Sequence, residues 1–282
     1  MGLEGPFGPL PVDLVRKILV AVYGDNGAAL LSLASVCRLF RDCAHQILAL
    51  QHFLDLRPVA LQQQSHTPLS AKRMSNLRNA QRQLRNAALR RCHQLHFIDL
   101  CGAHQYATDS TLETICQNAR TLESLLLRGC QALTQAGLAH LTAASCPLLK
   151  VLDLNACVHI GDASCLAGLP SLTHLDVGWC RQVSADSMAA VMPQLEHAVY
   201  HGCEAIEDWL LGTACCVRLL DCAFTPIGDR GLQLLAQVAQ NLQELILAAP
   251  AHNLWLSGNW TPLGLETFKQ QQPSVKVRLV FV

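Results

Sequence analysis

The sequence predicts an α/β solenoid, a curved ladder of parallel strands with helices on its outer side, preceded by a small module of three helices. Two observations predict this fold class. A short apolar pattern recurs seven times along the chain at intervals of 22 to 27 residues, and self-similarity at such a period indicates stacked repeats. The first 50 residues lack that pattern and have helical apolar spacing instead.

The composition is that of a folded chain without a strong overall charge. Of 282 residues, 51% are hydrophobic and 15% are charged, and the formal net charge is zero. This balance allows a buried core and provides no overall attraction for nucleic acid or an anionic membrane. The sequence shows no secretory leader and no apolar stretch long enough to cross a bilayer. We therefore expect a cytoplasmic and/or nuclear protein with neither a membrane nor a nucleic acid as partner.

The repeated pattern has the form L-x-x-L-x-L-x-x-C, with apolar substitutes. The L-x-L alternation predicts a strand, and the stretches that follow it, such as 135–145 and 228–239, have helical spacing. Prolines at positions 147, 170 and 193 end the helical stretches. This frame is the signature of leucine-rich repeats, and a last strand is expected at Val275 to Val280. The seven copies begin at residues 95, 122, 149, 172, 195, 217 and 242.

Cysteine occupies the ninth frame position in four units, at Cys130, Cys157, Cys180 and Cys203. We expect these thiols to be buried between strands and helices as small apolar side chains. No cysteine pair has the C-x-x-C spacing of a zinc site. The sequence therefore predicts no metal site and no cofactor.

The N-terminal helical pattern contains a specific set of apolar residues. It opens with Leu-Pro, has an Ile-Leu pair eight residues later and a Leu-Leu step, and closes with Val-Cys-Arg-x-Phe. Over residues 8–48 this set resembles an F-box, a module that docks on a Skp-family adaptor. The resemblance implies that the following residues include adaptor-docking and internal-core positions: Leu10, Pro11, Ile18, Leu19, Leu30, Leu31, Val36, Cys37 and Phe40.

The whole chain resembles the F-box/leucine-rich-repeat family, with cysteine-containing repeats. We expect an F-box at 8–48, a linker or degenerate first repeat with a basic helix at 49–91, and about seven repeats with a C-terminal cap strand at 92–282. The resemblance implies a substrate-recognition subunit of an SCF-type cullin-RING ubiquitin ligase, joined through the adaptor to the cullin and the RING protein. Because the sequence contains no catalytic motif, we expect no enzymatic activity and no catalytic residue.

The repeats predict where a protein substrate binds. Side chains alternate along a strand, so the third, fifth and seventh frame positions face away from the core. Asp recurs at the fifth position, where it forms an acidic stripe that favours a basic segment of substrate or is simply solvated. The predicted substrate-binding residues are Asp99, Arg128, Asp153, Asn155, His174, Asp176, Trp179, His201, Asp221, Trp255 and Trp260.

Three features of this surface have two interpretations each. Trp179 and Phe224, at the eighth position, are either binding anchors or packing residues of a neighbouring turn. His174 and His197 share one column about 5 Å apart and are either ordinary solvated histidines or a metal pair or pH switch, although no third ligand is evident. The loop at 249–262, with Trp255 and Trp260, is either a lip over the concave face or a C-terminal seal.

A basic segment follows Asp55 and extends to Asp99 without an acidic residue. Its eight arginines and lysines include three at i, i+4 and i+7 on one helical face, Arg78, Arg82 and Arg85. Such a run is either a solvated helix of a degenerate repeat or an anion-binding surface. The alternative function is therefore a ligase-independent repeat scaffold that acts through residues 72–91.

Overall fold

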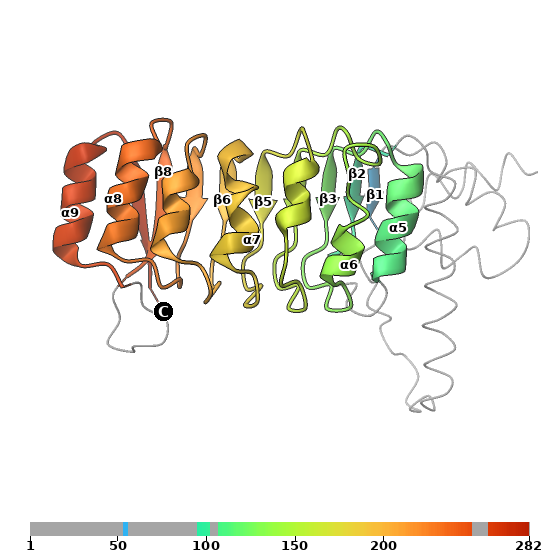
Figure 1. Cartoon of the computed structure of the whole chain (residues 1–282), viewed down its shortest axis with the longest axis horizontal. Coiled ribbons are helices and arrows are strands. Elements are labelled where there is room, and N and C mark those ends of the chain that lie inside the picture. The colour runs from blue at the N-terminus through green and yellow to red at the C-terminus, as the bar shows by residue number, and fades with distance from the viewer. Residues whose placement is uncertain (1–52, 56–94, 102–106, 250–258, 282) are drawn as a thin grey trace, which may run out of the picture.

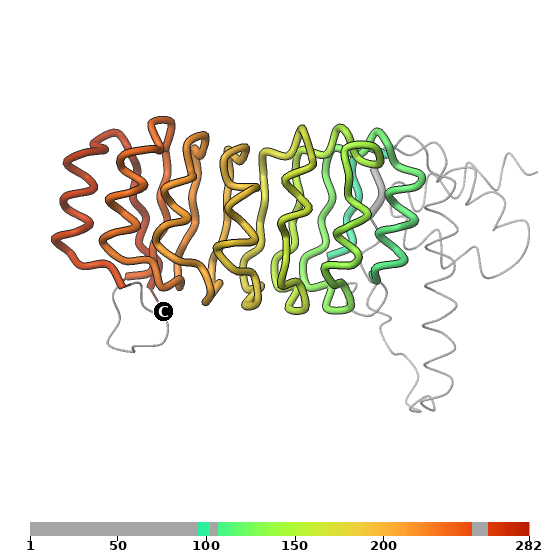
Figure 2. Tube along the Cα trace, in the orientation of Figure 1, coloured from blue at the N-terminus to red at the C-terminus, as the bar shows by residue number. Residues whose placement is uncertain are grey.

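The computed structural model describes residues 53–55, 95–101, 107–249 and 259–281, and it has two layers. One layer is a sheet of parallel strands and the other is a row of helices, so that all helices cover the same face of the sheet (Figure 1). Each unit leaves the sheet, passes through the helical layer and returns to the neighbouring strand, as the trace in Figure 2 shows. We call the face opposite the helices the strand face.

The sheet contains nine strands that pair in chain order, each parallel to the next. Equivalent frame positions pair with one another, for example His174 with His197. The seven strands predicted from the frame and the last predicted strand are present, whereas the first strand, Phe53–Asp55, was not predicted. The strands are β1 (Phe53–Asp55), β2 (Phe97–Asp99), β3 (Ser124–Leu126), β4 (Val151–Asp153), β5 (His174–Asp176), β6 (His197–Val199), β7 (Leu219–Asp221), β8 (Glu244–Ala248) and β9 (Lys276–Val280).

The helical layer is less regular than the sheet. Ten-residue α-helices occur in three units, whereas the others return through short α-helical or 3₁₀ turns. The prediction of a helix over 135–145 was correct only for its first turn, because Thr142 and Ser145 bind each other's backbone and side chains and so compete with helical hydrogen bonds. The elements are α5 (Asp109–Asn118), α6 (Gln135–Leu138), η1 (Ser164–Gly168), α7 (Ala185–Ala189), η2 (Met192–Gln194), η3 (Asp208–Thr213), α8 (Asp229–Val238) and α9 (Pro262–Gln271). Among the described residues, none of these helices has the length and apolarity needed to cross a membrane.

The core lies between the two layers and is built from the same frame positions in every unit. The middle residue of each strand from β2 to β7 points into it, as Leu125, Leu152 and Leu175 do, with at most 2% of their surface exposed. Leucine, alanine and cysteine fill most of the remaining space, with few aromatic rings. The low aromatic content of the sequence therefore follows from the narrow and constant distance between the strand and helix layers.

The four ninth-position cysteines are fully buried and form a repeated hydrogen bond. The thiols of Cys130, Cys157, Cys180 and Cys203 each donate to the backbone carbonyl of the sixth frame residue in the preceding unit, at 3.1 to 3.3 Å. Burial raises the pKa of Cys157 and of Cys203 to about 12. These cysteines therefore join consecutive units as protonated thiols.

Candidate functional site

The turn that follows each strand places the eighth frame residue in the left-handed backbone region. This residue has φ between 57° and 71° in five consecutive units. A positive φ is uncommon for residues other than glycine, yet three of these five positions hold a side chain. The five residues are Gly129, Ala156, Trp179, Gly202 and Phe224.

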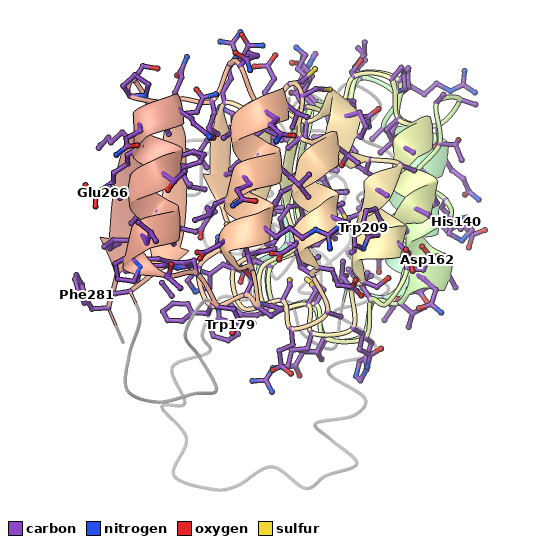
Figure 3. All side chains as sticks on the ribbon, turned by 60° about the vertical axis from the view of Figure 1, so that its left-hand side comes forward. His140, Asp162, Trp179, Trp209, Glu266 and Phe281 are labelled. Atoms are coloured by element: carbon purple, nitrogen blue, oxygen red, sulfur yellow. The ribbon has the colours of Figure 1, made fainter. Side chains whose placement is uncertain are left out.

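Trp179, His201 and Phe224 form a cluster of aromatic rings at this turn. The ring centroids of Trp179 and His201 lie 5.2 Å apart, those of His201 and Phe224 lie 4.9 Å apart, and those of Trp179 and Phe224 lie 6.4 Å apart. Gly202 permits this packing, because a Cβ atom there would collide with the Trp179 ring. The three rings are half-buried, and Trp179 lies at the lower edge of the coloured ribbon in Figure 3.

The predicted acidic stripe is present and has a structural role in each strand. The Oδ1 atoms of Asp99, Asp153, Asp176 and Asp221 each accept a hydrogen bond from the backbone N–H two residues later, at 2.8 to 3.0 Å. This is the local side-chain turn that aspartate commonly makes. The carboxylates thereby hold the end of each strand in place, whichever partner their second oxygen contacts.

Beside the aromatic rings, Arg128 and Asn155 bind two of these carboxylates. The Arg128 guanidinium lies 3.3 Å from Asp153 and 3.5 Å from Asp176. The Asn155 amide donates to Asp176 at 3.1 Å. Burial raises the pKa of Asp176 above its usual range, although hydrogen bonds and Arg128 act in the opposite direction.

Asp221 holds the same frame position as Asp153 and Asp176, at the end of β7. Its Oδ2 atom lies 3.6 Å from Nδ1 of His201. Burial raises the pKa of Asp221 as well, against the effect of its backbone hydrogen bond and of His201. Seven of the predicted substrate-binding residues thus lie together with Phe224 at the carboxyl ends of β3 to β7. We call this set the strand-end surface: Arg128, Asp153, Asn155, Asp176, Trp179, His201, Asp221 and Phe224.

His174 and His197 lie at the other end of the strands. Their ring centroids are 4.1 Å apart, which agrees with the predicted adjacency. Burial lowers the pKa of His174, and the neighbouring His197 lowers it further. Within the described residues no group of three His, Cys, Asp or Glu side chains is arranged to hold a metal ion.

Two predicted site residues have different positions from those expected. Trp260 is 5% exposed and packs in the core, so the prediction that it forms a lip was wrong; its burial fits the alternative of a C-terminal seal. Asp99 is only 8% exposed, because the turn that it forms folds over its carboxylate. Three predicted features lie outside the described residues: Trp255, the nine adaptor-binding residues and the basic segment 72–91.

Sequence reasoning named Phe224 as a possible anchor without including it in the substrate-binding set, and it did not consider Gly202. Both hold the eighth frame position, where glycine alternates with larger residues. Glycine that recurs at one frame position, as at Gly102, Gly129 and Gly202, indicates a left-handed turn, and this signal predicts the same backbone geometry for Trp179 and Phe224. Their contact across Gly202 required the structure.

Comparison with known proteins agrees with this architecture. A family model described as Leucine Rich repeat matches residues 168–192. A chain from the crystal structure of the Rad7 and Elc1 complex in yeast superposes with a TM-score of 0.61 at 14% identity, over 97% of this chain and 65% of that chain. The fold is a leucine-rich-repeat solenoid.

The remaining comparisons add little to the solenoid assignment. An internalin C2 from Listeria monocytogenes covers 99% of this chain and 100% of its own length, at 16% identity and a TM-score of 0.43. No curated protein matches the sequence. The solenoid shown here spans 65% of the length of the yeast chain, and at 14% identity that likeness shows the fold alone.

Proposed function

We propose that the chain is the substrate-recognition subunit of an SCF-type cullin-RING ubiquitin ligase. In this proposal residues 8–48 bind a Skp-family adaptor and, through it, the cullin and the RING protein. The leucine-rich repeats bind the protein to be ubiquitinated. The observation that carries the binding role is the strand-end surface, where charged and aromatic side chains from five units of the solenoid meet.

Two further points support the ligase role. The N-terminal Leu-Pro and Val-Cys-Arg-x-Phe elements stand at F-box spacing. The yeast chain of similar fold was solved in a complex with a second protein, as a receptor that works through an adaptor would be. The proposed mechanism is positional. A substrate lysine held near a charged ubiquitin carrier reacts faster because its effective concentration is raised, so the chain itself needs no catalytic residue.

Adaptor binding tests the ligase role directly. The Leu10→Ala, Pro11→Ala double variant of the full chain is expected to lose co-purification with the Skp-family adaptor and the cullin. The matched control is Trp179→Leu, on the strand-end surface, which is expected to keep the adaptor and lose substrate. Mass spectrometry of the partners captured under proteasome inhibition measures the recovery of the adaptor and of the substrate. Undiminished adaptor recovery with the double variant would show that the docking assignment is wrong.

The alternative is a ligase-independent scaffold that acts through the basic segment 72–91. It is favoured by the uneven charge of the chain, because residues 1–94 contain 12 basic and five acidic residues while residues 95–282 contain nine basic and 16 acidic residues. In that case no adaptor would co-purify, and partner binding would weaken steeply as salt is raised. The same purification, repeated at two salt concentrations, separates the two functions.

A further inference from the structure

The strand-end surface contains more negative than positive charge. Three carboxylates, Asp153, Asp176 and Asp221, lie on it beside one guanidinium. Arg128 lies within 3.5 Å of both Asp153 and Asp176, so its charge is already compensated. His201 contributes a positive charge next to Asp221 only when it is protonated. A ligand that approaches this surface therefore meets an excess of carboxylate.

The repeat region as a whole also carries a net negative charge. Residues 95–282 contain 16 acidic and nine basic residues, a difference that attracts cationic segments over distances of about 10 Å at ordinary ionic strength. This charge lies on many units and is independent of the local arrangement at Arg128. It raises the encounter rate with a basic partner and disfavours an acidic or phosphorylated one.

The aromatic cluster supplies a second kind of attraction for a cation. The Trp179 and Phe224 rings are nearly parallel, at 19°, while His201 stands at 66° and 73° to them. The face of an aromatic ring carries partial negative charge, and tryptophan attracts arginine and lysine most strongly. Both rings pack against His201, so they are held in place before a ligand arrives and lose little entropy on binding.

We propose that the strand-end surface binds an arginine or lysine side chain from an extended segment of a partner protein. The cation lies against Trp179 and Phe224, with the carboxylates of Asp176 and Asp221 beside it. This inference deepens the proposed function, since it names the chemistry of the recognised substrate segment. A phosphorylated segment is disfavoured, because the guanidinium at this surface is already paired with two carboxylates.

The test follows the tryptophan side chains of the full chain by NMR. The chain has four tryptophans, so ¹⁵N labelling gives four indole signals, and the Trp179→Phe variant assigns one of them. The probe is a short blocked glycine–serine peptide with a central arginine. Its matched controls carry citrulline, which keeps the shape without the charge, or glutamate. The arginine peptide is expected to shift the Trp179 signal saturably and to bind about tenfold more tightly than the citrulline peptide.

Three variants locate the binding site. Trp179→Leu is expected to lower the affinity for the arginine peptide about tenfold, and Trp179→Phe to lower it less because a ring remains. Asp221→Asn is expected to weaken binding several-fold, since the amide can still accept the backbone hydrogen bond from Ala223. Trp209→Phe is the matched control, because Trp209 is an exposed residue of η3 in the helical layer (Figure 3). Circular dichroism checks that each variant is folded.

Each contrary outcome overturns the proposal. Equal affinity for the arginine and citrulline peptides would exclude recognition of charge. Tighter binding of the glutamate peptide would indicate an acidic partner held by Arg128. Unchanged arginine binding in a folded Trp179→Leu variant would place the cation elsewhere on this acidic domain. The assay contains no adaptor, so its failure leaves the ligase role intact, whereas loss of adaptor binding would leave peptide recognition intact.

Discussion

The ninth frame position explains why four of the 14 cysteines recur at a fixed place in consecutive units. At the ninth position the side chain must be small enough for a tight turn, apolar enough for the core and able to donate one hydrogen bond. Cys180 meets all three requirements, with no exposed surface and a thiol 3.2 Å from the Leu154 carbonyl. Serine would donate as well but would bury a hydroxyl among leucines, which is costlier.

His174 makes the stability of the protein sensitive to pH. Its ring packs against His197 and lies 2.8 Å from the Thr173 hydroxyl. Burial and the charge of a protonated His197 lower the pKa of His174, while Glu196 acts in the opposite direction. The folded state therefore prefers the neutral imidazole more strongly than the unfolded chain does.

The sign of the resulting pH dependence follows from linkage. Above the unfolded pKa of about 6.5 both states are neutral and the packing of His174 is fully stabilising, whereas below it the unfolded chain binds the proton more readily. The free energy of unfolding should fall as the pH drops from about 7.5 to about 5.5. The free energy of unfolding of the His174→Gln variant should fall less over the same pH range, as measured by urea denaturation at both pH values.

The exposed residue His140 provides the control for this pH experiment. Its imidazole lies on the outside of the molecule (Figure 3). The His140→Gln variant should therefore retain the pH dependence of the wild type. If His174→Gln and His140→Gln behaved alike, the histidine pair would not be the origin of the effect.

Consecutive helices are joined by an aspartate–glycine contact that recurs three times among the described residues. The first helical residue of one unit is an aspartate whose carboxylate accepts the backbone N–H that opens the next helix, at 2.7 to 2.9 Å. A glycine stands three residues beyond that N–H, where any Cβ atom would meet the same carboxylate. The pairs of aspartate and glycine are Asp109 with Gly137, Asp208 with Gly231, and Asp229 with Gly264.

The glycines of these aspartate–glycine contacts should not tolerate even a methyl group. At Gly231 an added Cβ atom would lie 2.6 Å from Oδ1 of Asp208 and 2.9 Å from a methyl carbon of Ile227. We expect Gly231→Ala to lower the free energy of unfolding by about 1 to 3 kcal/mol, the usual cost of overpacking. Thermal denaturation measures the change.

Gly168 is the matched control, because nothing lies within 4 Å of a Cβ atom placed there. Gly168→Ala should leave the stability almost unchanged or raise it slightly, since alanine has less freedom in the unfolded chain. Equal effects of the two substitutions would show that the contact between Asp208 and Gly231 does not limit the fit of consecutive helices.

The strands were predictable from sequence to a greater extent than the helices. Period-two alternation around a buried apolar residue, leucine in all but β6, marks β3 to β8, because one side of each strand is buried. The return segments share no such strict pattern, and local competition by Thr142 and Ser145 shortened α6. β1 was not predicted, although residues 52–56 read HFLDL and match HFIDL at 96–100 in the register of the β1–β2 pairing; position 51, the first of the frame, holds glutamine in place of leucine.

The whole molecule is a one-dimensional array in which each unit contacts mainly its neighbours. Every strand from β2 to β8 pairs with two others, whereas β9 pairs only with β8 among the described residues. In such arrays stability is the sum of unit and interface contributions, so units at the ends open more easily than those in the middle.

Hydrogen exchange should reveal this gradient. The amides of Val177 and Tyr200 donate to the neighbouring strand at 2.9 and 2.7 Å, and the amide of Ala249 donates to Val280 at 2.8 Å. Although these bonds have similar lengths, the Ala249 amide should exchange at least tenfold faster, as measured by mass spectrometry of exchanged peptides. Equal protection at all three amides would mean that the ladder opens as one cooperative unit.

The candidate site could be predicted in part at this scale. The repeat frame assigns Asp153, Asp176 and Asp221 to one column, and the ladder brings them together as expected. The frame cannot show that these carboxylates also bind their own backbone, or that the Trp179 ring reaches across Gly202 to its neighbours. Such contacts depend on side-chain rotamers, which a repeating pattern does not encode.

The left-handed turn at the eighth frame position separates the chemistry of the surface from the stability of the scaffold. Its backbone conformation is the same whether the residue is glycine, alanine, phenylalanine or tryptophan. A solenoid of this kind can therefore acquire a new specificity by exchanging one turn residue per unit, while the buried leucines and cysteines remain as they are. Homologous chains with identical cores could in this way recognise unrelated proteins.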